Sequence, residues 1–95
     1  MPAIKLLDAV TSDTVGQAFS PRVHWCKIGV TIEGSGSATV EIQELIGDTW
    51  FTIDSESHET PGNKEVIELS KAFDSIRAVT SGQSGVTVTV TLMHP

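Results

Sequence analysis

The fold of this chain is indicated most clearly by residues 86–93, VTVTVTLM, close to its C-terminus. Valine or leucine alternates there with threonine or methionine along the whole run. An apolar period of two places every second side chain on the same face of a β-strand. One face of this strand is therefore expected in a core, and the other in solvent or in an interface.

The rest of the chain repeats this pattern between short turn signals. Apolar and polar residues alternate in 22–33 and again in 37–46, and glycine-containing turns stand at 34–37, 47–48 and 81–85. No stretch sustains an apolar period of 3.6 residues, so helices are not expected. The prediction is one all-β domain over residues 1–95, with seven antiparallel strands at 3–10, 22–33, 37–46, 49–54, 64–70, 74–80 and 86–93.

Each of the three turns is expected to close a β-hairpin between the strands on either side of it. The predicted packing is an aligned two-sheet β-sandwich, Ig-like or jelly-roll-like. Two polar loops, 11–21 and 55–63, are long for so small a domain, and such loops are typically mobile or functional. The segment 69–74 has room for one helical turn.

The charge of the chain argues against several kinds of partner. Twelve acidic and six basic residues give a net charge of −6, and no two basic residues are adjacent. Nucleic-acid-binding domains concentrate positive charge, so direct binding to nucleic acid or to an anionic membrane is not expected. Cys26 is the single cysteine, and neither a signal peptide nor an apolar membrane span is recognisable. We expect a soluble protein made in the cytosol.

Candidate catalytic and metal-binding residues are few. His24 and Cys26 share a strand face and could bind zinc with His58 or His94, but the paired ligand motifs of structural zinc sites are missing. Residues 54–59, DSESHE, match the spacing of neither a calcium loop nor a catalytic triad. We therefore expect no enzyme activity, no cofactor and no metal. A small hydrolase built around His58 is the weakest alternative.

Trp25 and Trp50 point most directly to a binding surface. A tryptophan in a sandwich usually belongs to the core or its edge, but Trp is also enriched at binding hot spots. A stacking platform for sugars is an alternative, although the chain has only two Trp, three Phe and no Tyr. The predicted interface residues are Trp25, Trp50, Leu45, Met93, Ile4 and Leu6.

The order of several stretches resembles that of small β-sandwich structural proteins in the virions of tailed bacteriophages. The matching stretches are 1–10 MPAIKLLDAV, 32–42 IEGSGSATVEI, 47–53 GDTWFTI, 75–82 SIRAVTSG and 85–90 GVTVTV. Residues 43–46, QELI, depart from the usual pattern and leave the subgroup open. The resemblance brings no catalytic residues with it.

The resemblance implies a virion protein, in the first place a head decoration (cement) protein that binds the major capsid protein and stabilises the shell. A tail or head–tail joint component is the nearest alternative, and a carbohydrate-binding module or adhesin is an alternative from another class. Homo-oligomerisation is expected, because a small sandwich leaves edge strands open to pairing. Residues 1–21 are expected either to form an arm that contacts a partner or to supply a core strand at 3–10.

Overall fold

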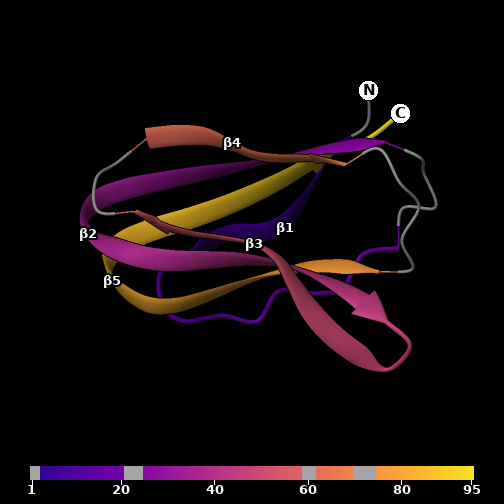
Figure 1. The fold of residues 1–95 in the computed structure, drawn as a ribbon. Coiled ribbons are helices and arrows are strands. Elements are labelled where there is room, and N and C mark those ends of the chain that lie inside the picture. Colours follow the sequence, from indigo (N-terminus) through magenta and orange to yellow (C-terminus); the bar gives the residue numbers. More distant parts are fainter. Residues whose placement is uncertain (1–2, 21–24, 59–61, 70–74) are drawn as a thin grey trace.

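The computed structural model describes residues 3–20, 25–58, 62–69 and 75–95, and it shows a single small all-β domain (Figure 1). All strand pairings are antiparallel, and the described residues contain no helix. In this part of the chain there is accordingly no helix long and apolar enough to cross a membrane. The strands are β1 (Ala3–Val10), β2 (Cys26–Ile46), β3 (Thr49–His58), β4 (Gly62–Leu69) and β5 (Ile76–Met93).

The prediction of seven strands is wrong, because the described residues form five strands in one sheet. The difference arises at 34–37 and 81–85, where hairpin turns were expected and where the long strands β2 and β5 instead continue. The hairpin across 47–48 is confirmed, because Ile46 of β2 pairs with Thr49 of β3. The first predicted strand is confirmed as β1.

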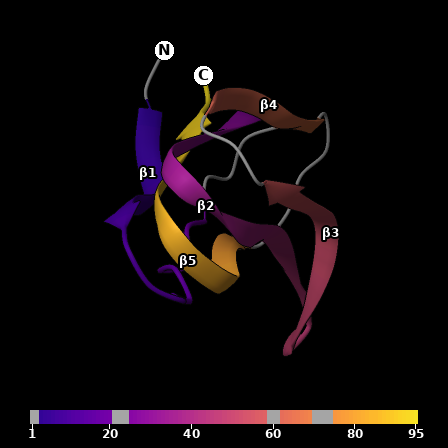
Figure 2. The ribbon, with the colours of Figure 1, turned by 90° about the vertical axis from the view of Figure 1, so that its left-hand side faces the viewer.

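β2 and β5 form the spine of the sheet. They pair with each other from Lys27 opposite Met93 to Glu44 opposite Ile76, on both sides of the expected turns. The strand order is β1-β5-β2-β3, and β4 also pairs with β2. The other edge of β2 is shared, since β4 pairs with its first part and β3 with its last part. In Figure 2, β4 lies at the top and β3 along the right side of the molecule.

Glycines allow β2 and β5 to bend where the turn signals stand. Gly34 and Gly85 have positive φ angles of 125° and 68°, a region that glycine enters without steric cost. A Cβ atom on Gly36 would collide with the backbone carbonyl oxygen of Ser84 in β5. The register between the two strands also shifts in this part of β2. Irregular pairing around glycine therefore bends the strand pair without ending it.

One hydrophobic core collects side chains from both halves of β2 and of β5. Alternate residues of these strands are buried on either side of the bend, as the period of two predicts. The run 86–93 is confirmed as a strand with its valines and leucine facing the core. The buried core residues are Leu6, Leu7, Cys26, Ile28, Val30, Ile32, Ala38, Val40, Ile42, Ile76, Ala78, Val86, Val88, Val90 and Leu92.

The described part of the predicted loop 11–21 is tied to β5 of the same chain. The backbone N–H of Gly16 donates a hydrogen bond to the carbonyl of Ala78 at 2.8 Å. Phe19 and Ile76 exchange two backbone hydrogen bonds, of 2.9 and 2.8 Å. These bonds place the segment along the first half of β5, on the edge that β2 does not occupy.

The second predicted loop, 55–63, is shorter than expected. β3 extends to His58, and β4 begins at Gly62. The extension pairs with β2, so that Ser55 lies opposite Glu41 in the register. Residues 70–74, which make up most of the predicted helical turn, lie outside the described residues.

We expect Gly36→Ala to destabilise the fold, because the new methyl group would have to displace the backbone of β5 at Ser84. Overpacking of this kind lowers the free energy of unfolding by about 1–3 kcal/mol. Gly62→Ala is the matched control, since a Cβ on Gly62 would meet no atom within 4 Å. Chemical denaturation compares the two variants, and equal stabilities would contradict the close approach of β2 and β5 at the bend.

We expect a chain that lacks residues 1–10 to unfold, because the deletion removes the buried Leu6 and Leu7 together with the β1–β5 pairing. Burial of one leucine side chain stabilises a fold by about 1.5–3 kcal/mol, a large part of the total for a small domain. Circular dichroism and thermal unfolding measure the outcome. A truncated chain that stays folded but no longer binds its partner would support the arm alternative for residues 1–21.

Candidate functional site

The hairpin formed by the end of β2 and the start of β3 reaches beyond the rest of the sheet (Figure 1). Its two-residue turn begins at Gly47, which has a φ angle of 66°. A glycine at this position is typical of a type II′ turn, whose twist matches that of the flanking strands. Ile46 lies opposite Thr49, and Leu45 lies opposite Trp50. The register of the hairpin is therefore fixed up to its end.

Apolar side chains are concentrated at the end of this hairpin. Ile46 is 56% exposed and Phe51 is 49% exposed. Their neighbours Leu45 and Trp50 are half-buried. Single exposed apolar residues are ordinary on protein surfaces, whereas a group of them on a protruding element marks a binding surface. We call Leu45, Ile46, Trp50 and Phe51 the hairpin tip. Leu45 and Trp50 lie on one face of the hairpin, and Ile46 and Phe51 lie on the opposite face.

Trp50 is stacked against an arginine from β5. The guanidinium carbon of Arg77 lies 4.2 Å from the centroid of the Trp50 ring, within the range of a cation–π interaction. The Nε atom of Arg77 also donates a hydrogen bond of 2.8 Å to Oε1 of Gln43. Gln43 lies opposite Arg77 in the β2–β5 register, so three strands contribute to this contact. The stack and the hydrogen bond together fix the orientation of the guanidinium.

The outer face of the sheet around Arg77 mixes polar and apolar side chains. Val79 follows two residues later on the same face of β5, and Val15, which pairs with it, is 61% exposed. Glu41 of β2 lies opposite Val79 and accepts a hydrogen bond of 3.0 Å from the hydroxyl of Thr52. This face therefore presents a fixed cation beside apolar side chains, together with a carboxylate that already has a hydrogen-bond donor.

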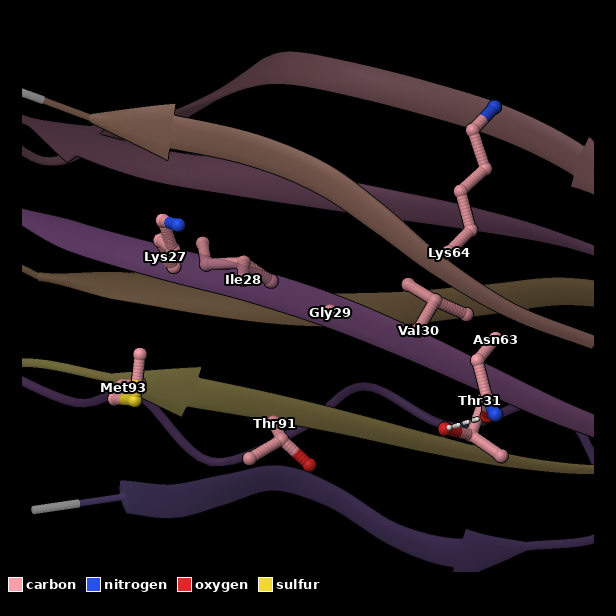
Figure 3. A pocket seen from close by; sticks show the side chains of 9 residues that line it. All are labelled: Lys27, Ile28, Gly29, Val30, Thr31, Asn63, Lys64, Thr91 and Met93. Atoms are coloured by element: carbon pink, nitrogen blue, oxygen red, sulfur yellow. Dashed lines mark hydrogen bonds between the residues drawn. The ribbon is translucent and has the colours of Figure 1, made fainter.

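A second surface feature is a groove beside β2, β4 and the end of β5, with a volume of about 350 Å³ (Figure 3). The amine of Lys64 points away from its centre, where Gly29 adds no side chain. Trp25 lies beside the groove, with the ammonium of Lys27 5.9 Å from its ring centroid. The residues that line the groove are Lys27, Ile28, Gly29, Val30, Thr31, Asn63, Lys64, Thr91 and Met93.

The predicted interface residues do not form one patch. Trp50 and Leu45 belong to the hairpin tip, whereas Met93 lines the groove. The two candidates from β1 lie at neither place. Ile4 packs partly against the core, and Leu6 is buried within it at 4% exposure. β1 thus contributes to the fold of the domain and not to either of these surfaces.

Three residues at or beside the hairpin tip were not among the predicted interface residues: Ile46, Phe51 and Arg77. A sequence signal for the first two exists, because Leu45-Ile46 and Trp50-Phe51 are consecutive apolar pairs. The two members of such a pair lie on opposite faces of the strand, so at most one of them can face the core. The contact of Arg77 with Trp50 has no such signal, since it depends on which strands become neighbours.

The residues considered as candidate zinc ligands have different surroundings. Cys26 is fully buried in the core, and the ring of His94 packs against Phe19 at a centroid distance of 5.6 Å. His24 and the side chain of His58 lie outside what the structure describes. Over the described ranges, no group of three His, Cys, Asp or Glu side chains is arranged to hold a metal ion.

Two solved structures share this fold at low sequence identity. The SPBc2 prophage-derived protein YomS matches with a TM-score of 0.66 and 14% identity, over 96% of this chain and 89% of YomS. PirA matches with a TM-score of 0.57 and 14% identity, over 97% of this chain and 82% of PirA. At such identity the likeness concerns the fold alone. No family model matches the sequence, and neither does any curated protein.

We expect Ile46→Ala and Ile42→Ala to differ strongly in their effect on stability, although the two residues lie four apart in β2. Ile42 is fully buried, so its truncation leaves a cavity and costs about 2–5 kcal/mol of the free energy of unfolding. Ile46 is exposed, and its truncation should change that free energy by less than about 0.5 kcal/mol. Urea denaturation tests the difference. A comparable loss in both variants would show that the hairpin tip packs against the domain.

Proposed function

We propose that this protein is a structural component of a tailed-bacteriophage particle and that its hairpin tip binds another virion protein. The observation that carries the proposal is the hairpin tip itself, which exposes apolar side chains on a protruding hairpin beside a fixed arginine. Trp and Arg are enriched among the residues that dominate protein–protein binding. In this proposal the protein acts by binding and not by catalysis.

Two observations support a phage particle as its place of action. Several stretches of the sequence resemble small virion proteins of tailed phages, and a prophage-derived protein has the same fold. The resembling stretches 47–53 and 75–82 supply the hairpin turn, Trp50 and Arg77. The resemblance and the candidate surface therefore involve the same residues.

The specific role we propose is that of a head decoration (cement) protein. Copies of the domain, associated as a homo-oligomer, would bind the major capsid protein and stabilise the shell, after synthesis in the host cytoplasm. A small domain has little core of its own, so a partner that binds only the folded state adds stability. A tail or head–tail joint component is the alternative. Copy number separates them, on the order of hundreds per particle for a shell protein and about six to twelve for a joint.

We also infer that the bent sheet is a variant of the two-layer sandwich. Each half of the β2–β5 pair buries one face in a shared core, as each layer of a sandwich does. β1 and β4 flank one half of the pair, whereas β3 and the segment 14–19 flank the other. An experimental structure with the two halves facing each other across the core would support this inference, and one flat open sheet would contradict it.

A carbohydrate-binding module or adhesin is the alternative from another class. Sugars stack on an open aromatic face, whereas the guanidinium of Arg77 already covers one face of Trp50. The indole nitrogen of Trp25 donates a hydrogen bond of 2.9 Å to Glu68. A glycan array that shows binding by the wild-type protein, and loss of it in Trp50→Ala, would favour this alternative.

Quantitative mass spectrometry of purified phage particles tests the proposed function. We expect the wild-type protein in the particles, and a variant that combines Ile46→Ser with Phe51→Ser to be at least about tenfold less abundant there. Both substitutions affect exposed side chains and leave the core unchanged. Glu33→Gln, at an exposed position elsewhere on β2, serves as the control and should keep the wild-type level. Absence of the wild-type protein from the particles would overturn the proposal.

A further inference from the structure

The guanidinium of Arg77 has unused hydrogen-bonding capacity. Its Nε atom is bound to Gln43, and its plane is stacked on Trp50. Among the described residues, no acceptor is hydrogen-bonded to its terminal nitrogens Nη1 and Nη2. The Arg77 side chain is nevertheless half-buried. Because burial removes part of its hydration, an incoming acceptor would restore hydrogen bonds to these two nitrogens.

The contacts that Arg77 already makes leave a geometry that suits a carboxylate. With Nε occupied by Gln43, the edge formed by Nη1 and Nη2 remains, and such an edge can donate two parallel hydrogen bonds to one carboxylate. The stack on Trp50 holds the plane in place before a ligand arrives. A side chain that is ordered beforehand loses less conformational entropy on binding.

The surroundings of Arg77 favour an acidic protein segment over other anions. Leu45 lies on the same outer face as Arg77, next to Trp50, and Val79 follows on the same face of β5. A ligand that covers this surface needs apolar groups next to its carboxylate, and a protein segment provides them. A nucleic acid backbone, whose charged groups are phosphates, does not provide them.

We propose that Arg77 anchors the partner of this protein by a bidentate pair with an aspartate or glutamate side chain, while Leu45 and Val79 on the same face contact apolar residues next to that carboxylate. Gln43 and Trp50 act as positioning residues for the guanidinium. This inference rests on the proposed function and specifies the chemistry of the partner surface. A desolvated arginine beside a tryptophan is the kind of pair that dominates binding energy in protein interfaces.

A synthetic peptide tests this chemistry directly. The probe is a capped peptide that alternates leucine with glutamate, and its control carries glutamine in place of each glutamate. The NMR signal of the Trp50 indole N–H, assigned with the variant Trp50→Phe, reports binding. We expect saturable binding of the acidic peptide and at least about tenfold weaker binding of the neutral one. Equal dissociation constants, or no saturable binding of the acidic peptide, would overturn the proposal.

A matched pair of variants separates the role of Arg77 from that of net charge. Arg77→Gln and Lys5→Gln each remove one positive charge, and Lys5 lies exposed on β1. We expect Arg77→Gln to weaken binding of the acidic peptide at least about tenfold and Lys5→Gln to leave it unchanged. Arg77→Lys should restore only part of the affinity, because lysine keeps the charge but lacks the planar fork. Circular dichroism verifies that each variant is folded.

Two further results with these reagents would overturn the proposal. If Arg77→Gln and Lys5→Gln weakened binding of the acidic peptide equally, the loss would come from net charge and not from the position of Arg77. Tighter binding of a single-stranded oligothymidylate than of the acidic peptide would identify the site as one for nucleic acid.

Incorporation into phage particles distinguishes this inference from the proposed function. Particles that contain the wild-type protein but little of Arg77→Gln would support both. Equal amounts of the two would overturn the carboxylate anchor and leave the structural role in place. Particles without the wild-type protein would overturn the proposed function, and the peptide results alone would then decide whether Arg77 binds carboxylates.

Discussion

The pairing of β2 with β5 on both sides of their bend is the constraint on which the rest of this structure depends. It requires the two backbones to approach closely at Gly36 and Ser84, where any side chain on Gly36 would collide with a carbonyl oxygen. Because β2 and β5 pair on both sides of the bend, their backbone groups bond to the neighbouring strand there and not across a hairpin turn at 34–37. Had 34–37 formed a turn, the two halves of β2 would have paired with each other and the order of the sheet would differ.

This long pair also decides where the exposed hairpin stands. The edge of β2 that faces away from β5 is long enough for two partners, β4 and β3. β3 follows β2 directly through a two-residue turn, so their last pairs lie at the end of the long strand. At this end Ile46 and Phe51 remain exposed and do not enter the core. Exposed apolar side chains of this kind are typical of surfaces that another protein covers.

The cation–π contact between Trp50 and Arg77 links the hairpin of β2 and β3 to β5. Gln43, Trp50 and Arg77 come from three different strands, and their contacts hold a cation in a fixed orientation on the surface of an acidic protein. A fixed cation next to apolar groups favours a partner with the complementary arrangement, because electrostatic complementarity sets register and excludes wrong partners.

The sequence by itself determined the all-β class and the alternating core residues of β2 and of 86–93, whereas Leu6, predicted in an interface, lies in the core. A period of two is a property of strand geometry and does not depend on which strands become neighbours. The strand at 86–93 and its buried face could therefore be predicted without a structure. The tight turn at 47–48 could be predicted as well, because its conformation depends only on the residues of the turn. Only the tertiary structure decided whether 34–37 was a turn or a bend, since glycine and serine permit both and the outcome depends on the distant Ser84. The same holds for Arg77, whose partner Trp50 is brought to it by long-range strand pairing that no local pattern encodes.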